Sequence, residues 1–500
     1  MRKEMKPEAM GKKQIKKATD NRALLSKQEE SYDVIVIGSG PAGLMSAITA
    51  AKNGLRTLVL EQKNEAAKKI YATGNGRCNL TNETWDDECY RGSGSALAQR
   101  ITARYDKDWL LDYFRELGLL TKSIGDYYYP YNEQASAVVN VLLAEVRRLG
   151  IVLHTGERAV SIRDCGEKTD RSAKERPDGD ANGQGVNTGA SYSVATDQTE
   201  YRTGAVVIAV GGKASPTHGS DGNFNKVIRG LGHHIVMQQS ALVPLVMADQ
   251  SLEQLSGVRV KCEVSLFVGE DTERAKGPLT DGKKAVASDR GEIIYNKNTI
   301  SGIPVLQVSR FATVAMGEGK QAALYLDLFP ELSREELLEA LERGFHPEGD
   351  PERTCVEALG YLLPQKMAEY VADRFLGKKM QGAGQRQKKA NMEQGNDSGK
   401  GVLSADVSKE KLTELTDILQ AFRIEISGDA GSSRAQVSAG GVEIGEVTKQ
   451  LESKLLPGIF FAGEILDVDG MCGGYNLHWA FASGYVAGKN VVEGTRRNSV

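Results

Sequence analysis

The sequence predicts an α/β fold in which one parallel-sheet domain is interrupted by an inserted module of strands and helices. Continuous apolar stretches at residues 32–38, 205–210 and 458–463 are typical of strands buried on both faces of a parallel sheet. Between the second and third stretches, residues 260–268 alternate in the manner of a half-exposed strand, and residues 333–375 have helical periodicity. Because buried strands occur on both sides of the insertion, we expect one interrupted domain and not a row of separate domains.

The composition is that of an ordinary globular protein with an excess of glycine. The 500 residues include 55 glycines, which suit tight turns and close backbone approaches such as nucleotide-binding loops. The net charge of -3, from 63 Lys+Arg and 66 Asp+Glu, gives no reason to expect a nucleic-acid partner. Six cysteines without a CxxC pair predict no metal site, and no apolar run approaches the ~18 residues of a membrane span. We therefore expect a cytoplasmic protein of unspecified oligomeric state with no membrane partner.

The first structured unit is a strand, a glycine-rich turn and a helix. Gly38, Gly40 and Gly43 follow the first apolar strand, and Glu61 ends the next one. This spacing is typical of dinucleotide binding, because Gly38 permits the tight turn and Gly40 lets the backbone approach a pyrophosphate. Glu61 would bond a ribose hydroxyl and disfavours a 2′-phosphate, so we expect no NADP in this site.

A second motif near the C-terminus decides between NAD and FAD. The strand that ends at Gly463 is followed by Glu464, and residues 469–476 lead into a helix. This arrangement resembles the second FAD motif of glutathione-reductase-like flavoproteins, in which the acidic residue bonds the ribityl chain. The N–H groups at the helix N-terminus would face the flavin and stabilise its anionic reduced form. We therefore predict a glutathione-reductase-like FAD-binding Rossmann domain.

A further glycine-rich segment, residues 68–82, comes directly after the Glu61 strand. It contains Gly74, Gly76 and Arg77. Such a segment can wrap a dinucleotide and present the guanidinium to a phosphate or a flavin carbonyl. An ordinary surface loop is the alternative interpretation.

Together these residues resemble the BaiN-like, aminoacetone-oxidase-like family of NAD(P)/FAD-dependent oxidoreductases. The resemblance rests on residues 34–61, 73–82, 210–216 with 219–222, and 436–488. It implies a glutathione-reductase-type domain that binds FAD noncovalently and is interrupted by a barrel and a helical part. The family name also implies NAD(P)H as a donor. Because no second GxGxxG follows a buried strand, either NAD(P)H binds transiently at the flavin face or the organic substrate is itself the donor.

His478 stands where the family pattern has Gln, and the resemblance places it near the flavin. Two roles stay open for it: a proton donor in catalysis, or a hydrogen-bonded histidine at the start of a helix. Cys78 and Cys472 also fall in segments that the resemblance brings toward the flavin. Since neither is flanked by the paired motif of disulfide reductases, we expect two unpaired packing cysteines.

These patterns divide the chain into five parts and give a set of candidate site residues. The parts are a disordered basic extension at 1–31, the first part of the FAD-binding domain at 32–240 with a polar insertion at 164–204, a β-barrel-like subdomain at 241–332, a helical subdomain at 333–434 with a linker at 377–401, and the second part of the FAD-binding domain at 435–492. Ser333 and Glu336 match a capping box at the start of the helical part. The candidate catalytic residue is His478, and the candidate cofactor-binding residues are Gly38, Gly40, Pro41, Ala42, Gly43, Glu61, Gln62, Lys69, Gly74, Asn75, Gly76, Arg77, Cys78, Asn79, Gly211, Gly212, Gly463, Glu464, Asp469, Gly473, Gly474, Tyr475 and Asn476.

The predicted function is that of an FAD-dependent oxidoreductase acting on a small organic substrate. It would transfer a hydride between that substrate and NAD(P)H or an organic donor. Reduction of an activated C=C bond is favoured, because His478 could supply the proton that this reaction needs. A flavin-dependent amine oxidase of the aminoacetone type is the alternative. From another class, a non-catalytic flavin-binding or RNA-associated scaffold has only the basic extension in its favour.

Overall fold

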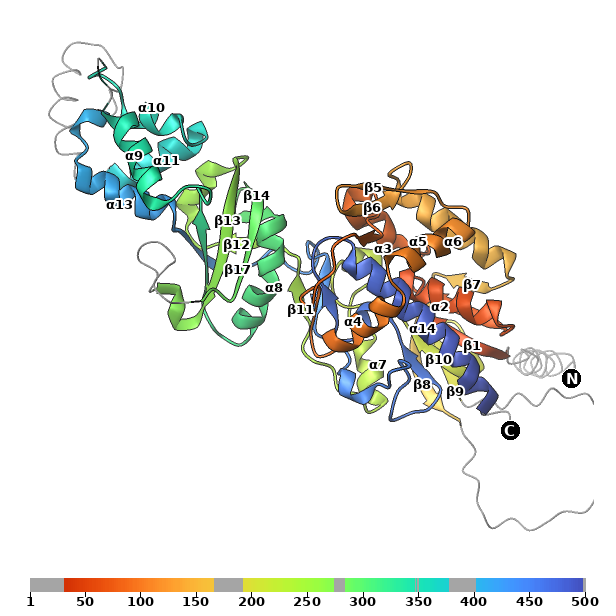
Figure 1. Ribbon diagram of the computed structural model, residues 1–500. Coiled ribbons are helices and arrows are strands. Elements are labelled where there is room, and N and C mark those ends of the chain that lie inside the picture. The colour runs from red at the N-terminus through yellow and green to blue at the C-terminus, as the bar shows by residue number, and fades with distance from the viewer. Residues whose placement is uncertain are drawn as a thin grey trace, which may run out of the picture.

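The computed structural model forms two lobes, which Figure 1 shows side by side. The Rossmann lobe contains the parallel sheet, and the inserted lobe contains a barrel with a cap of helices. The structure describes residues 31–165, 192–273, 284–346, 348, 350–376 and 402–497. Three predicted features lie wholly or partly outside the described residues: the basic extension up to residue 30, the polar insertion over 166–191, and the linker at 377–401.

A sheet of seven strands in the described residues forms the centre of the Rossmann lobe, in the order β7-β2-β1-β10-β9-β8 with β19 paired to β10. β1, β2, β7, β10 and β19 run parallel, and β8 and β9 extend the sheet in antiparallel pairs. Val34, Ile35 and Val36 of β1 are completely buried, as predicted from the continuous apolar run. The strands are β1 (Ser31–Ile37), β2 (Thr57–Glu61), β7 (Val152–Thr155), β8 (Ala159–Asp164), β9 (Tyr192–Thr196), β10 (Glu200–Ile208) and β19 (Ile459–Phe461).

The pairing of β10 with both β1 and β19 confirms the predicted α/β fold, because it joins strands from both sides of the insertion in one sheet. The bounds of the polar insertion differ from the prediction. β9 and the first half of β10 lie inside the range 164–204, because Tyr192, Val194 and Tyr201 are buried in the sheet. Their apolar side chains are separated by polar ones, which gave the segment the composition of a loop.

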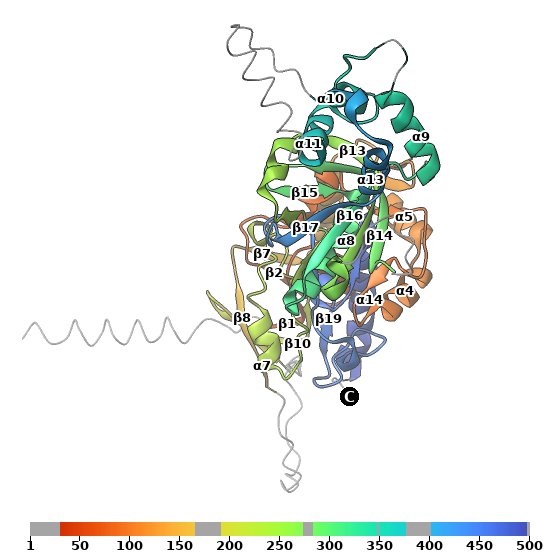
Figure 2. The same ribbon diagram turned by 90° about the vertical axis from the view of Figure 1, so that its left-hand side faces the viewer.

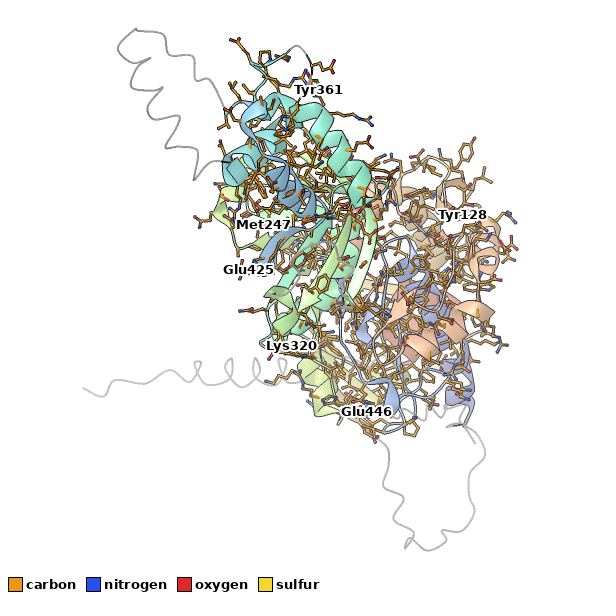
Figure 3. All side chains as sticks on the ribbon, turned by 60° about the vertical axis from the view of Figure 1, so that its left-hand side comes forward. Tyr128, Met247, Lys320, Tyr361, Glu425 and Glu446 are labelled. Carbon is orange, nitrogen blue, oxygen red and sulfur yellow. The ribbon has the colours of Figure 1, made fainter. Side chains whose placement is uncertain are left out.

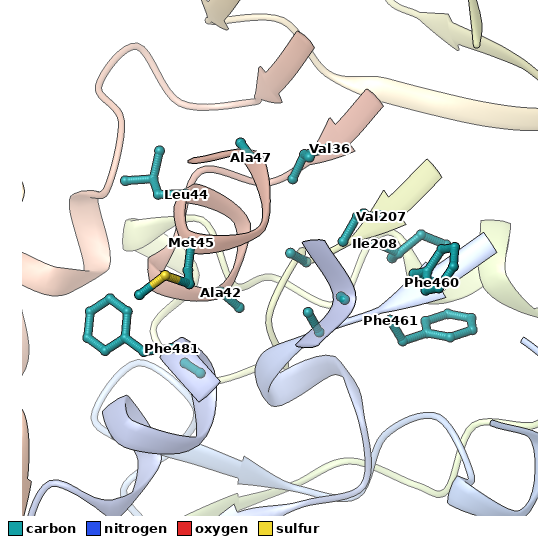
Figure 4. Close-up of a cluster of buried hydrophobic side chains, with 14 of the residues drawn as sticks. Val36, Ala42, Leu44, Met45, Ala47, Val207, Ile208, Phe460, Phe461 and Phe481 are labelled. Carbon is teal, nitrogen blue, oxygen red and sulfur yellow. The ribbon is translucent and has the colours of Figure 1, made fainter. Parts of the chain in front are cut away.

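Two helices from opposite ends of the chain, α2 (Pro41–Lys52) and α14 (Tyr475–Arg497), pack closely beside this sheet. A Cβ on Gly484 would lie 2.4 Å from the carbonyl oxygen of Ala42, and one on Gly488 would lie 2.4 Å from that of Ser46. Figure 4 shows Phe481 of α14 beside Met45 of α2, within the apolar core. The other helices of this lobe are α3 (Lys68–Ala72), α4 (Ser95–Arg104), α5 (Lys107–Glu116), α6 (Ala135–Arg148) and α7 (Asn225–Gly230).

The inserted lobe is a closed barrel in the order β12-β15-β14-β13-β16-β17. Cys262, Val264 and Leu266 on one face of β13 are completely buried, as the alternating pattern predicts, but Ser265 and Phe267 on the other face are also buried, so only the first half of the strand is half-exposed. The strands are β12 (Leu245–Met247), β13 (Arg259–Val268), β14 (Ala287–Tyr295), β15 (Thr299–Gly302), β16 (Ala322–Asp327) and β17 (Phe422–Asp429), and α8 (Ile303–Gly317) packs against them.

A cap of helices lies over the end of the barrel that is far from the Rossmann lobe (Figures 1 and 2). Its helices are α9 (Arg334–Phe345), α10 (Cys355–Gly360), α11 (Gln365–Leu376) and α13 (Lys409–Leu419). The predicted capping box is present at α9, where Ser333 and Glu336 exchange hydrogen bonds. In Figure 3, Tyr361 marks the outer end of the cap, and Tyr128 and Glu446 mark the Rossmann lobe.

The range 333–434, predicted as helical, also contains β17, the last strand of the barrel. Phe422, Ile424 and Ile426 alternate with polar residues and point into the barrel core. The helices are therefore an excursion between two barrel strands, β16 and β17. Three short sheets complete the fold: β11 (Gln239–Ala241) with β18 (Val437–Ala439), β20 (Asp469–Gly470) with β4 (Tyr90–Arg91), and β3 (Thr81–Asn82), β6 (Tyr127–Pro130) and β5 (Thr121–Ile124).

Candidate functional site

The glycine-rich turn between β1 and α2 leaves one position open toward a ligand. Gly38 has a φ of +101°, and a Cβ there would lie 2.5 Å from the carbonyl oxygen of Ala209. A Cβ at Gly43 would lie 1.9 Å from the carbonyl oxygen of Gly38. A Cβ at Gly40 would meet no protein atom within 4 Å. Gly38 and Gly43 are therefore required for chain packing, whereas Gly40 borders open space.

That open space belongs to a cavity of about 450 Å³ at the carboxyl ends of the parallel strands. Ligands of open α/β sheets bind at such an edge, and the volume is within the usual range for ligand sites. The turns after β1, β2, β10 and β19 and the first residues of α14 line the cavity. The candidate cofactor-binding residues among the lining are Gly38, Gly40, Pro41, Ala42, Glu61, Gln62, Lys69, Gly211, Gly212, Gly463, Glu464 and Asn476.

Glu61 is held in place by its own lobe at one side of the cavity. The backbone N–H and the hydroxyl of Ser39 donate to Glu61 Oε2 at 3.0 and 2.6 Å, and the N–H of Lys63 donates to Oε1 at 2.8 Å. A carboxylate has about four lone-pair sites, so acceptor capacity remains for hydroxyl groups of a ligand. Gln62 Nε2 donates to the carbonyl oxygen of Gly219 at 2.6 Å and ties the segment after β10 to this side.

Glu464 forms a second carboxylate at the cavity, after β19. Lys69 Nζ lies 2.7 Å from Glu464 Oε2, and the N–H of Ser438 donates to Oε1 at 2.9 Å. β1 and β10 separate β2 from β19 in the sheet, so two strands lie between Glu61 and Glu464, on either side of the glycine turn. Gly212 packs against Ser438 and Glu464, because a Cβ there would be 2.6 Å from Ser438 Oγ and 2.8 Å from Glu464 Oε1.

Four basic residues of the lining were missed in the sequence: Lys68, Arg158, His218 and Lys226. Burial and the nearby lysines, including Lys68, lower the pKa of His218, so this imidazole is mostly neutral near pH 7. Together with Lys69, the lysines and arginine supply cationic groups that suit a pyrophosphate, and they are balanced in the lining by the carboxylates of Glu61, Glu157, Asp221 and Glu464. Lys68 begins the predicted segment 68–82 and His218 precedes the 219–222 glycine block, but no pattern singled out these four side chains.

The candidate segment 74–79 lies beside the cavity and does not line it. Gly74, Asn75 and Cys78 all have left-handed φ values near +55° to +60°. Arg77 Nη1 lies 3.6 Å from Glu133, and its guanidinium covers the ring of Tyr129. The structure thus gives Arg77 partners within the protein, as expected for the surface-loop interpretation.

Asn79 and Cys78, which end this segment, are buried in different ways. Asn79 Oδ1 is buried without a hydrogen-bond partner and is therefore available to a ligand donor. Cys78 is completely buried, and burial raises the pKa of its thiol to about 12, so this thiol stays protonated. Cys472 is also a free thiol with a pKa raised by burial. These properties suit packing cysteines better than a redox pair.

The C-terminal segment 469–476 packs directly against the segment around β3. A Cβ on Gly474 would lie 2.9 Å from three backbone atoms of Thr81, and one on Gly473 would lie 2.9 Å from Asn82 Nδ2 and 3.4 Å from the ring of Tyr127. Asn476 holds the turn by accepting from the N–H of Gly470 and donating to its carbonyl oxygen, both at 2.8 Å. Of the candidates here, only Asn476 lines the cavity; Asp469, Gly473, Gly474 and Tyr475 support the start of α14.

His478 is completely buried and does not line the cavity. Its Nε2 donates to the carbonyl oxygen of Tyr105 at 2.7 Å, so its Nδ1 accepts from the hydroxyl of Thr81 at 2.8 Å. Burial lowers the pKa of His478 to about 4, so the ring is neutral near pH 7. With both nitrogens occupied and no proton to give, His478 fits the alternative of a hydrogen-bonded structural histidine and not the candidate proton donor.

The cavity fits FAD on several independent observations. The open position at Gly40 gives a pyrophosphate access to the N-terminus of α2, where backbone N–H groups and the helix dipole favour negative charge. Glu61 and Glu464 suit ribose and ribityl hydroxyls on either side of this turn. Asn79 Oδ1, a buried acceptor without a donor, lies in the segment beside the cavity and not in its lining. Within the described ranges, no group of three or more His, Cys, Asp or Glu residues could hold a metal ion, and none of the helices is long and apolar enough to span a bilayer.

A Rossmann turn that opens on such a cavity defines a nucleotide-cofactor protein, and comparison with known proteins narrows this class. The model of the HI0933-like protein Rossmann domain matches residues 32–490, so the chain belongs to this family and the predicted family resemblance is confirmed. The chain is 32% identical to the 3-dehydro-bile acid delta(4,6)-reductase of Clostridium scindens over 92% of its own length and 98% of that protein. It is 24% identical to the ribosomal RNA dihydrouridine synthase of Escherichia coli, over 93% and 98% of the two chains. The chain is an FAD-dependent oxidoreductase, as predicted.

Proposed function

We propose that this enzyme reduces a C=C bond conjugated with a carbonyl group in a small organic molecule, and that NADH or NADPH supplies the electrons. The observation that carries the proposal is the cavity between Glu61 and Glu464, whose open glycine turn suits one dinucleotide. FAD in this cavity would accept a hydride from a donor and pass it to one carbon of the C=C bond, while the other carbon would take a proton from water. Without a second dinucleotide turn, NAD(P)H would bind only transiently.

The names of the relatives support the choice of substrate class. The Clostridium scindens protein is named a delta(4,6)-reductase of a 3-dehydro-bile acid, in which the double bonds are conjugated with a ketone. Dihydrouridine forms when the uracil C=C bond next to a carbonyl is reduced, so the Escherichia coli protein is named for the same bond type in RNA. The first relative shares more identity with this chain, and the near-neutral net charge also favours a small molecule over RNA.

Two carboxylates, one glycine turn and one helix N-terminus around the cavity would hold the cofactor. Glu61 would accept a ribose hydroxyl, the backbone beside Gly40 and Pro41 would bind the pyrophosphate, and Glu464 would accept a ribityl hydroxyl. The start of α14, fixed by Asn476, would place its N–H groups near the flavin ring. No step in this scheme uses His478 as an acid.

An anaerobic experiment with the holoenzyme separates the alternatives. NADH or NADPH should bleach the flavin, and a 3-oxo-Δ4 bile acid should restore its colour, whereas the same acid without the double bond should not. Recolouring by ribosomal RNA alone would favour the dihydrouridine reaction. Bleaching by aminoacetone, followed by peroxide on admission of oxygen, would contradict the reductase and favour the amine oxidase.

A further inference from the structure

The pairing of β4 with β20 brings one arginine of the Rossmann lobe to the junction with the barrel. Arg91 of β4 pairs with Asp469 of β20, the strand that leads into the glycine turn before α14. Its guanidinium carbon lies 5.0 Å from the ring centre of Phe311 on α8. Arg91 is thus placed between the inserted lobe and the turn that carries Gly473 and Gly474.

Asp469 interacts with Arg91 through its charge, but its side-chain oxygens are hydrogen-bonded to another arginine. Arg310 of α8 places its Nε 2.9 and 2.8 Å from the two oxygens of Asp469, which is 1% exposed. Nη1 of Arg91 is buried without a hydrogen-bond partner. An unpaired cationic N–H group in a buried position is costly, so its presence indicates an acceptor that arrives with a ligand.

The charges around Arg91 indicate which kind of acceptor fits. Asp469 interacts with it on the Rossmann lobe, together with Glu88, and Asp289 of β14 interacts with it from the barrel. Arg310 is the second cation in the cluster. With three carboxyl groups near two guanidinium groups, a further full negative charge is disfavoured. A neutral oxygen can accept a hydrogen bond from Nη1 without being repelled by these carboxyl groups.

The surroundings also place Arg91 beside the turn that the proposed function assigns to the flavin ring. Gln307 of α8 accepts from the N–H of Cys472 at 2.9 Å, which docks the inserted lobe on this turn. Gly473 lies against the ring of Tyr127, and Tyr127 interacts electrostatically with Asp289 as Arg91 does. Asp289 of the barrel thus interacts with both Arg91 and Tyr127 at the junction of the two lobes.

We propose that Arg91 is a substrate-binding residue that donates a hydrogen bond to the carbonyl oxygen of a conjugated ketone. This inference rests on the proposed function and adds to it the residue that recognises the substrate's polar group. A guanidinium on the carbonyl oxygen also withdraws electron density from the conjugated C=C bond, which makes that bond more receptive to hydride.

Ligand binding to the oxidised holoenzyme tests the proposal without any turnover. The variants are Arg91→Met, Arg91→Lys and, as a matched control, Arg100→Met on the exposed face of α4. The probes are cyclohex-2-enone, which carries only the conjugated ketone, and cyclohexanecarboxylate, which carries only a carboxylate. Calorimetry or the flavin difference spectrum gives each dissociation constant, and urea unfolding of the apoprotein gives stability.

We expect Arg91→Met to raise the dissociation constant of cyclohex-2-enone by about tenfold. Arg91→Lys should raise it less, and Arg100→Met should leave it unchanged. Arg91→Met leaves three carboxyl groups beside one cation, so apoprotein stability should fall, whereas Arg91→Lys keeps the charge and should keep most of the stability. A purely structural arginine would therefore give an Arg91→Lys variant that binds the enone as tightly as wild type does.

Three results would overturn the proposal: wild-type enzyme that does not bind the enone, equal enone affinity in wild type and Arg91→Met, or a loss confined to the carboxylate probe. Failure of the proposed function is a separate result, because it appears as a flavin that NAD(P)H does not bleach or that no enone recolours. The binding constants of the oxidised enzyme remain measurable in that case.

Discussion

The two glycine turns of the Rossmann lobe, at residues 38–43 and 473–474, differ in what lies beside their glycines. In the first turn, Gly40 borders open space in the cavity, while its neighbours Gly38 and Gly43 touch the backbone. In the second turn, both glycines touch the chain itself, at Thr81, Asn82 and Tyr127. Glycine in such motifs therefore serves two purposes, and only the contacts of each position reveal whether the space beside it is meant for a ligand.

The largest expected effect comes from adding a side chain in the second turn. Gly474→Ala would place its Cβ 2.9 Å from the backbone of Thr81 and would also strain a φ of +97°. We expect the apoprotein to lose about 3 kcal/mol or more of unfolding free energy in a urea titration. Gly257→Ala is the control, because Gly257 has a similar φ of +87° with no atom within 4 Å of its Cβ. Equal losses in the two variants would show that the close contact is unimportant.

Adding a methyl group in the first turn should separate binding from folding. Gly40→Ala should raise the dissociation constant of FAD by about 100-fold, because the methyl group occupies the approach to the pyrophosphate. The urea midpoint of the apoprotein should stay close to that of wild type, since no protein atom lies within 4 Å of the added Cβ. Gly428→Ala on β17, which is equally free of neighbours, should change neither value. A lower midpoint without weaker FAD binding would reverse the roles that we assign to the two turns.

A smaller effect is expected from the carboxylate beside the first turn. Glu61→Gln keeps the shape of the side chain and removes the charge that a ribose hydroxyl would meet. We expect FAD to bind about tenfold more weakly, as for the loss of one charged hydrogen bond. Fluorescence titration of apoprotein with FAD measures this change. Unaltered affinity would mean that Glu61 only orders its own turn, through Ser39 and Lys63.

The smallest effect on catalysis is expected from His478→Gln, in the helix that follows the second turn. Gln can still donate to Tyr105 and accept from Thr81, and His478 does not line the cavity. Flavin reduction and reoxidation rates should therefore stay within about twofold of wild type. A selective loss of substrate reduction would restore His478 as a proton donor.

The same variant should change how stability depends on pH. Burial lowers the pKa of His478 from 6.5 to about 4, so below pH 6.5 the unfolded chain binds a proton that the folded chain does not. This contribution to stability is complete above pH 6.5 and is lost as pH falls toward 4. A shift of this size corresponds to about 3 kcal/mol. His478→Gln should remove that part of the acid sensitivity in urea titrations between pH 7 and 4, and identical pH profiles would contradict it.

The parts of the fold that the sequence predicted are those with strong local signals. The buried runs at Val34–Val36 and Phe460–Phe461 could be recognised because parallel strands are apolar on both faces. β17 was missed, since three alternating apolar residues after a helical stretch are a weak pattern. The cavity lining near Glu61 followed from its motif, but His218 and Arg158 have no motif and reach the cavity only through the tertiary fold.

The role of His478 shows why spacing alone does not assign chemistry. Its partners, Thr81 and Tyr105, come from β3 and from the end of α4, almost 400 residues before it in the chain. The role of Arg91 could not be predicted from the sequence either. Its Nη1 lacks a hydrogen-bond partner in a fold where Asp469 is hydrogen-bonded to Arg310. In both cases the function of the side chain depends on which hydrogen-bond partners the fold places beside it.

The measurement that tests the central claim most directly is the cofactor content of the purified chain, with FAD titrated into the apoprotein. The cavity beside Gly40 predicts a yellow protein that releases one FAD per chain on acid precipitation and takes up one FAD again, while Gly40→Ala with wild-type stability takes up far less. A colourless wild-type protein that takes up no FAD, or a Gly40→Ala variant that binds FAD as tightly as wild type, would contradict the account.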